Sequence, residues 1–208
     1  MNKVFSIVVL VGVAGTASAE IIGGYAISAT PVSAQEIVGG GGIWSSLNIV
    51  NVPLSINDAF SGSPLADDGY ANGQAGVTVQ CTFAVGDLVN GSGPDLLFVD
   101  SRYSDNSYNI YIGNDGFTVP MFAGGAGSSG DTRDYYYGGG GPYRADLIVY
   151  AFDLSSWGVA PGGVVTDVRF VGLSDQVDPI GFGSINVPAP GALAALGMGA
   201  LFAGRRRR

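Results

Sequence analysis

The apolar residues between Glu20 and Asn186 come in short runs, and clusters of Gly, Asn, Asp, Ser and Pro separate one run from the next. Almost no segment repeats its apolar positions with the spacing of a helix. Short strands bounded by turn-forming residues are typical of an all-β sandwich or barrel. The pattern therefore predicts a single all-β domain, a β-sandwich, over residues 20–186.

Two segments predict strands of the core. In residues 76–83 apolar and polar side chains alternate, so one face of this strand should be buried. That face consists of Val77, Val79, Cys81 and Phe83. The run Asp95–Asp100 is apolar almost throughout, which fits a central strand. We expect two further strands at residues 146–152 and 164–173.

Turn-forming residues divide the rest of the domain. Residues 108–113 and 117–122 flank Asn114-Asp115-Gly116, which tolerate positive φ, so these segments predict a hairpin. Residues 153–158 fit a single capped helical turn that ends at a glycine. The glycine-rich stretches 39–42 and 124–141 are expected to be loops, and the second one carries three consecutive tyrosines.

The first residues of the chain, 1–19, have the layout of a secretory signal peptide. Lys3 precedes an apolar run over residues 4–13, and Ala17-Ser18-Ala19 leads up to Glu20. The apolar run is too short to span a membrane as a helix. We expect cleavage between Ala19 and Glu20, with an N-terminal core helix as the alternative.

Residues 187–208 form a second distinct segment. Val187-Pro188-Ala189-Pro190 precedes an apolar stretch over residues 191–204, and Arg205-Arg206-Arg207-Arg208 follows. As a helix the apolar stretch would extend about 21 Å, which is short of a hydrocarbon core of roughly 30 Å. The arginines would hold their end in the cytoplasm. The segment therefore predicts a transient insertion into the inner membrane, with an uncleaved tail anchor as the alternative.

This segment resembles the PEP-CTERM sorting signal of Gram-negative-type bacteria, which is the substrate signal of exosortase-type enzymes. The Pro-x-Pro triplet, the apolar helix and the arginine cluster occur in the same order. Ala189 stands where the family has glutamate, which implies a variant sorting class. The resemblance implies export to the cell envelope, the outer surface or the extracellular matrix, with signal peptidase and an exosortase-type enzyme as processing partners.

A second resemblance lies within the domain. Several segments are similar to the β-sandwich ectodomains that occur upstream of such sorting tails: residues 90–100, 108–117, 152–154, 168–173 and 181–182. Those ectodomains resemble jelly-roll or discoidin-like modules. The resemblance therefore implies a sandwich of that type.

The charge distribution excludes two classes of partner. The chain has nine basic and 17 acidic residues, and Lys3 and the four terminal arginines leave four basic residues between them. The domain therefore carries a net charge of about −13 at neutral pH. A surface of that sign repels the phosphates of nucleic acids and anionic membranes.

The residue types also limit catalysis. The chain has no histidine, so it cannot form a Ser-His or Cys-His nucleophile, and the usual ligands of metalloproteases are missing. Cys81 is the single cysteine, and we expect a buried, inert thiol on a strand. These absences argue against an enzyme.

Aspartates remain as candidates for a metal site. A calcium ion takes about six to eight oxygen ligands from carboxylates and loop carbonyls and needs no histidine. Five aspartates at expected strand ends or loops form the candidate calcium site: Asp95, Asp100, Asp105, Asp175 and Asp178. Solvated surface acids are the alternative, because no EF-hand spacing is present.

Together these features predict an exported cell-surface or extracellular-matrix protein with a structural or adhesive role. The alternative is a calcium-assisted carbohydrate-binding module of the exopolysaccharide. Such a module would bind through exposed aromatic side chains, for which the candidates are Tyr103, Tyr108, Tyr135, Tyr136 and Tyr137. A secreted hydrolase, which would need two facing carboxylates in a cleft, is the third possibility.

Overall fold

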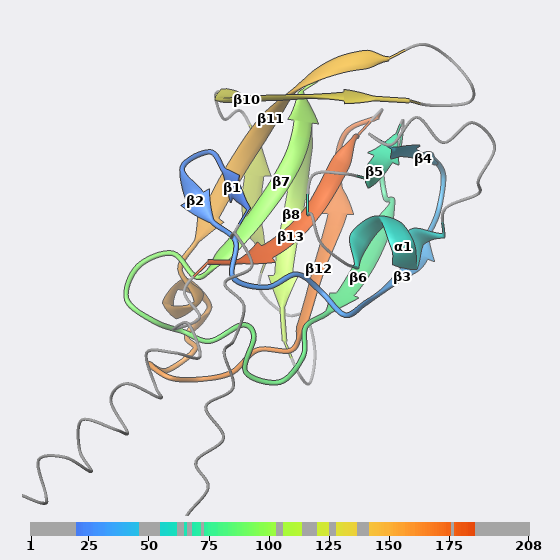
Figure 1. Ribbon diagram of the computed structural model, residues 1–208. Helices are drawn as coiled ribbons and strands as arrows, with labels where there is room; N and C mark the ends of the chain where they lie inside the picture. Colours follow the sequence, from blue (N-terminus) through green and yellow to red (C-terminus); the bar gives the residue numbers. More distant parts are fainter. Residues whose placement is uncertain are drawn as a thin grey trace, which may run out of the picture. The chain divides into compact units, whose positions relative to one another are not determined.

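The computed structural model describes ten stretches of the chain: residues 20–45, 55–61, 65, 68–71, 73–102, 106–113, 120–124, 128–136, 142–175 and 177–185. They belong to one compact unit, Ala19–Val187. Nearly all regular structure in this unit is β-strand (Figure 1), which confirms the all-β class. The predicted signal peptide and the sorting segment lie outside the described residues.

Two antiparallel sheets make up most of this unit. The four-stranded sheet has the order β10-β11-β7-β13, with β7 at Leu96–Arg102, β10 at Ser128–Tyr135, β11 at Tyr143–Phe152 and β13 at Pro179–Ser184. The five-stranded sheet has the order β3-β6-β12-β8-β9, with β3 at Ser33–Val38, β6 at Thr78–Thr82, β8 at Ser107–Ile112, β9 at Met121–Gly124 and β12 at Asp167–Gly172.

Two small sheets complete the described strands. β1 (Ile21–Ile22) pairs with β2 (Tyr25–Ala26), and β4 (Gly42–Ser45) pairs with β5 (Asp68–Ala71). No helix in the described part of the chain is long and apolar enough to cross a membrane.

The main strand pairs are nested in the sequence and form successive layers. β8 pairs with β9, β7 pairs with β11, and β6 pairs with β12, so each pair encloses the previous one in the sequence. A bridge between Gly73, just after β5, and Val177, just before β13, adds an outer layer. Pairing of β12 with β8 and of β13 with β7 then joins the layers into two sheets.

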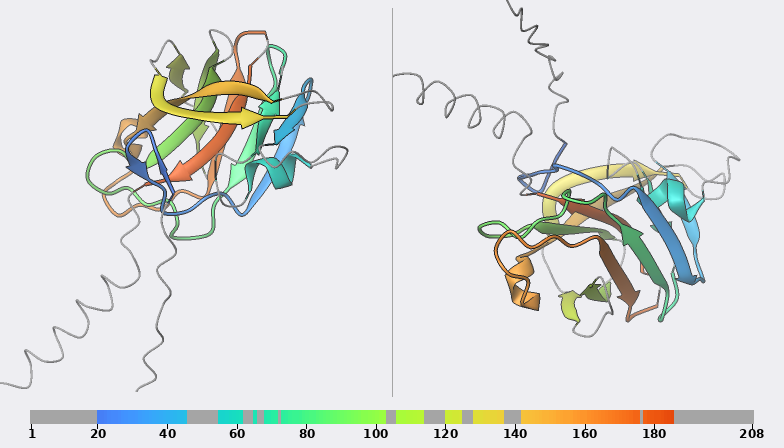
Figure 2. Two further views of the ribbon diagram at one scale, coloured as in Figure 1. Left: turned by 45° about the horizontal axis from the view of Figure 1, so that its top comes forward. Right: turned by 90° about the horizontal axis from the view of Figure 1, so that it is seen from below.

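The two sheets, which Figure 2 shows from two further sides, share an apolar core. The predicted buried face of β6 and its flanks is confirmed, because Val77, Val79, Cys81 and Phe83 all lie in this core. Burial raises the pKa of the Cys81 thiol, in line with an inert residue. Aromatic side chains from both sheets meet at the centre, with neighbouring ring centroids 4.8 to 6.2 Å apart: Phe98, Tyr108, Phe170 and Phe182.

The four-stranded sheet is buried on its other face as well. Leu97 and Val99 alternate along β7 with residues of the first core, and neither is exposed to solvent. They belong to a second core, to which the β1–β2 hairpin contributes Ile22 and the strand β11 contributes Leu147. A strand that is buried on both faces needs a continuous apolar run, which explains the sequence of residues 95–100.

Two local predictions are confirmed. β8 and β9 form the expected antiparallel pair, although the second strand begins at Met121 and the turn, residues 114–119, lies outside the described part. The helical turn is a short 3-10 helix, Leu154–Trp157. The Asp153 side chain accepts a hydrogen bond from the Ser155 N–H, and Gly158 ends the turn with φ 81°.

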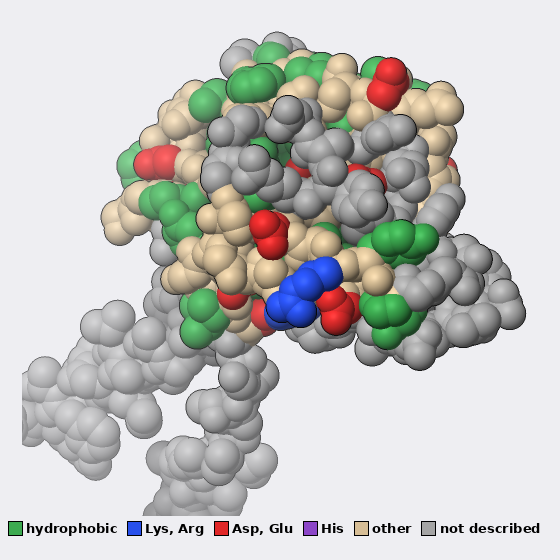
Figure 3. Space-filling view, turned by 90° about the horizontal axis from the view of Figure 1, so that it is seen from above, with side chains coloured by type: hydrophobic (Ala, Val, Ile, Leu, Met, Phe, Trp, Pro, Cys, Tyr) green, Lys and Arg blue, Asp and Glu red, His purple; other side chains and the backbone are tan. Residues whose placement is uncertain are grey.

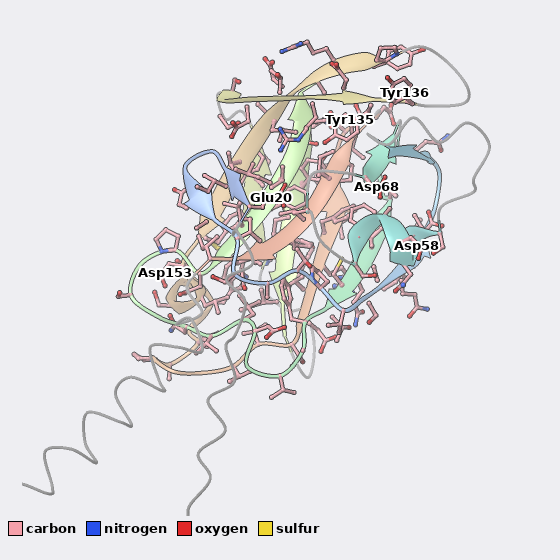
Figure 4. All side chains as sticks on the ribbon, in the orientation of Figure 1. Glu20, Asp58, Asp68, Tyr135, Tyr136 and Asp153 are labelled. Carbon is pink, nitrogen blue, oxygen red and sulfur yellow. The ribbon has the colours of Figure 1, made fainter. Side chains whose placement is uncertain are left out.

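The prediction of a loop over residues 124–141 is wrong for residues 128–135, while residues 125–127 and 137–141 lie outside the described part. Ser128–Tyr135 forms β10, which pairs with β11 and carries a bulge between Ser128 and Thr132. Tyr135, which is labelled in Figure 4, lies at the end of β10 and is fully buried in the second core. Pairing with a strong neighbouring strand therefore outweighs the unfavourable local composition.

A short helix that the sequence pattern did not indicate protects the edge of the five-stranded sheet. α1 (Ile56–Phe60) begins at Ser55, whose side chain exchanges hydrogen bonds with Asp58 in a capping box. Asn57 Oδ1 accepts a hydrogen bond from the Ala34 N–H of β3, 2.9 Å away. The helix thus occupies one of the outward donors of an edge strand, which would otherwise invite pairing with another chain.

Candidate functional site

Asp95 stabilises the chain around the start of β7. Its side chain is 1 % exposed, and both carboxylate oxygens accept backbone hydrogen bonds. Oδ1 accepts from the Gly91 N–H at 2.7 Å, and Oδ2 accepts from the Leu154 N–H at 3.0 Å. The carboxylate therefore joins the loop before β7 to the helical turn that follows β11.

Asp100 and Asp178 lie at the other end of β7. Asp100 is five residues from Asp95, or about 16 Å along an extended strand. Its Oδ1 accepts a hydrogen bond from the Tyr108 hydroxyl at 2.5 Å and another from Asn106 Nδ2 at 3.0 Å. Since Asp100 lies on β7 of the four-stranded sheet and Tyr108 lies on β8 of the five-stranded sheet, this contact joins the two sheets through their interior.

The same interior site contains a second carboxyl group. Asp178 is 1 % exposed, and its backbone carbonyl accepts hydrogen bonds from Ser101 N–H and Oγ, each at 3.0 Å. Burial raises the pKa of Asp100 well above its ordinary value, and the charge of Asp178 raises it further. Burial and the neighbouring Asp100 also raise the pKa of Tyr108. The site therefore favours a protonated carboxyl group.

The other two members of the predicted calcium site are Asp175 and Asp105. Asp175 is exposed, and its Oδ1 accepts a hydrogen bond from the Ala75 N–H at 3.3 Å. Asp105 lies outside the described residues. The structure thus brings Asp100 and Asp178 together and places Asp95 at the opposite end of the strand.

Calcium binding stays a prediction of the sequence. Within the described stretches, no three Cys, Asp or Glu side chains are grouped so that they could hold a metal ion. A rise in melting temperature with calcium, but not with sodium chloride of equal ionic strength, would be the expected sign of a site.

The structure contradicts two of the five aromatic residues proposed for carbohydrate binding. Tyr108 and Tyr135 are fully buried, so the prediction of exposed rings is wrong for both. Each ring fills one of the two cores, where aromatic burial contributes most to stability. Tyr136 is half-buried beside Tyr135 (Figure 4), and Tyr103 and Tyr137 lie outside the described residues.

A different surface gathers groups that can bind a ligand. We call it the outer sheet face: the side chains of the five-stranded sheet that point away from the core. It comprises Ser33, Gln35, Val38, Thr78, Gln80, Thr82, Ser107, Asn109, Tyr111, Phe122, Asp167, Arg169 and Val171. Strand alternation indicates from the sequence which of these residues share a side with their neighbours on the same strand.

The strand register places four of these side chains in one row. Gln35 of β3 lies opposite Gln80 of β6, Gln80 opposite Arg169 of β12, and Arg169 opposite Tyr111 of β8. The Arg169 guanidinium carbon lies 4.9 Å from the centre of the Tyr111 ring, a cation–π contact. Gln80, Arg169 and Tyr111 are all partly exposed.

In the next row of the sheet, the carboxylate of Asp167 fixes neighbouring side chains through hydrogen bonds. Asp167 Oδ1 accepts hydrogen bonds from Thr82 Oγ1 at 3.0 Å and from Gln80 Nε2 at 3.3 Å. Its Oδ2 accepts a third from Thr166 Oγ1 at 2.8 Å. These bonds fix the orientation of the polar groups on the surface before any ligand arrives.

The two sheets differ in charge. The strands of the five-stranded sheet contain only three charged residues: Glu36, Asp167 and Arg169. The strands β10 and β11 alone contain five: Asp131, Arg133, Asp134, Arg144 and Asp146. Figure 3, which views the molecule from above, shows basic and acidic side chains next to one another. The outer sheet face is therefore nearly neutral on a strongly acidic protein.

Comparisons with known proteins indicate no function for the chain. No family model matches the chain, and neither a curated protein nor a solved structure matches it.

Proposed function

We propose that the chain is an exported protein of the cell surface or extracellular matrix with a structural or adhesive role. A signal peptide directs its export, and a PEP-CTERM-like tail directs its sorting by an exosortase-type enzyme after transient insertion into the inner membrane. The supporting observation is that the compact unit, Ala19–Val187, begins and ends within a residue of the domain expected between the two signals. The role includes no catalysis.

The contacts of Glu20 support the proposed cleavage before this residue. Its backbone carbonyl accepts a hydrogen bond from the Ile27 N–H at 2.8 Å, and its Oε2 accepts one from the Leu65 N–H at 2.6 Å. Its Oε1 lies 3.8 Å from Arg133 Nη2 on β10. None of these contacts needs the residues before Glu20, so cleavage leaves a folded N-terminus.

We also propose that the module is a sandwich of the jelly-roll type. The nested pairing supports this, because a jelly roll is an antiparallel ribbon wrapped so that its layers fall alternately into two sheets. The pairs of β8 with β9 and of β6 with β12 lie in the five-stranded sheet. The pair of β7 with β11 lies in the four-stranded sheet.

Mass spectrometry of native material tests the sorting proposal. Protein recovered from the surface or matrix of the producing cells should begin at Glu20 and lack Arg205-Arg206-Arg207-Arg208. A chain that ends at Asn186 is the control, and it should be exported but not retained at the surface. Surface protein with an intact arginine cluster would contradict sorting by cleavage, and unexported protein would contradict the whole proposal.

A further inference from the structure

We infer that the outer sheet face binds an uncharged polysaccharide that runs across the strands along the row from Gln35 to Tyr111. The inference deepens the proposed function, because it rests on export to a place where polysaccharides surround the cell. It names the class of ligand and replaces the buried tyrosines with residues on a different surface.

The row has the length and the continuity of a binding surface for a chain. Its four side chains come from four adjacent strands in direct register, so they follow one line across the sheet. Adjacent strands lie about 4.8 Å apart, which makes the row about 14 Å long. A polymer of sugar rings can therefore contact several side chains with consecutive units.

The chemistry of the row suits sugars. A sugar hydroxyl both donates and accepts hydrogen bonds, and the amides of Gln35 and Gln80 do the same. The Tyr111 ring has a negative face, which attracts the weakly positive C–H groups of a sugar ring. Arg169 lies against this ring and adds several donors in a fixed plane.

The neighbouring row adds acceptors that are already oriented. Thr82, Gln80 and Thr166 hold the Asp167 carboxylate through three hydrogen bonds. A surface whose side chains are fixed in advance loses less conformational entropy when a ligand binds. The fixed orientation of these side chains distinguishes the neighbouring row from a set of freely rotating polar side chains.

Charge decides between an uncharged and an anionic polymer. The domain as a whole is strongly acidic and repels polyanions. The outer sheet face has one acid and one base, Asp167 and Arg169, so it has no net charge that would attract an anionic chain. A protein partner fits less well, because the centres of protein interfaces are depleted of charges and enriched in apolar groups, whereas amides and hydroxyls predominate here.

Affinity electrophoresis of the purified full-length chain tests the inference. The gels contain a mixed-linkage β-glucan, a galactomannan or a xylan as neutral polymers, and alginate as the acidic one. We expect retardation by at least one neutral polymer and none by alginate. Tyr111→Ala and Gln80→Ala should each weaken the retardation about tenfold, the scale of losing one stacked ring or one bonded amide.

Tyr143→Ala is the matched control, because Tyr143 is an exposed tyrosine on β11 of the other sheet. It should bind as the unchanged chain does, and circular dichroism should show that all variants are folded. The inference is overturned if no neutral polymer retards the chain, if only alginate does, or if Tyr111→Ala binds like Tyr143→Ala. Because the gels use purified chain, they give their answer whether or not the sorting tail is cleaved in the cell.

Discussion

The two sheets share one core, but their outer faces differ. On the four-stranded sheet the outward-facing Leu97, Val99 and Tyr135 are fully buried under a second core. On the five-stranded sheet the outward-facing Gln80, Tyr111 and Arg169 remain partly exposed. Strand alternation generates two faces in each case, and the segment that covers a face decides whether it stabilises the fold or stays available for binding.

This difference separates stability from recognition. Burying a large apolar side chain contributes about 1.5 to 3 kcal/mol, and β7 contributes such side chains to both cores. Polar side chains on an open face contribute little to folding. The four-stranded sheet should therefore tolerate few substitutions, and the outer sheet face should tolerate many.

Replacing the same residue type on the two faces gives the largest expected contrast. Tyr135→Ala should lower the free energy of unfolding by about 4 kcal/mol, because it leaves a cavity in the second core. Tyr111→Ala should lower it by less than about 1 kcal/mol. Urea denaturation measures both. Equal losses in the free energy of unfolding would contradict the proposed difference between the outer faces of the two sheets.

Asp100 should stabilise the contact between the sheets. Asp100→Ala removes the side-chain acceptor of the buried Tyr108 hydroxyl and one of the two acceptors of Asn106 Nδ2, which should cost about 3 kcal/mol. Asp167→Ala, on the outer sheet face, serves as the comparison and should cost less than about 1 kcal/mol because water can replace the lost partner. A smaller effect for Asp100→Ala than for Asp167→Ala would refute the assignment.

Asp100 should also make stability depend on pH. Its pKa is raised in the folded state, so the fold binds this proton more tightly than the unfolded chain does. The stabilisation is complete below 3.8, the ordinary pKa, and is lost as the pH rises through the folded-state pKa. Asp100→Asn cannot ionise, so its stability should fall less with rising pH than that of the unchanged chain. Parallel curves from denaturation at each pH would count against a protonated Asp100.

Gly23 tests how the β1–β2 hairpin covers the second core. Its φ is +58°, and a Cβ at this position would collide with Cγ2 of Val149 on β11. Gly23→Ala should therefore cost about 2 kcal/mol, from backbone strain and from displacement of the hairpin. Gly24→Ala has the same kind of strain but open space, so it should cost about 1 kcal/mol. Thermal melting of both variants separates the collision from the strain.

The contact of Glu20 with Arg133 should have the smallest effect. The Arg133 side chain is 37 % exposed, and its Nη2 lies 3.8 Å from Glu20 Oε1, so water and salt screen the pair. Glu20→Gln keeps an acceptor for the Leu65 N–H and should lower the free energy of unfolding by about 0.5 kcal/mol. The loss should shrink in high salt, and a loss that salt leaves unchanged would mean that the charge plays no part.

Local pattern in the sequence determined much of the first core. The alternation over Val77, Val79 and Cys81, the continuous run at 95–100 and the capped turn at 153–158 all appear in the structure as expected. Each of these features depends on neighbours within a few residues, so its signal lies in one short window.

The tertiary structure alone decided the rest. It turned Ser128–Tyr135 into a strand, buried Tyr135, brought Asp100 to Asp178 and aligned the row from Gln35 to Tyr111. These features require strands that are far apart in the sequence to pair in one register. Alternation marks two faces on each strand, but long-range packing alone selects the neighbours and determines which face a second layer covers.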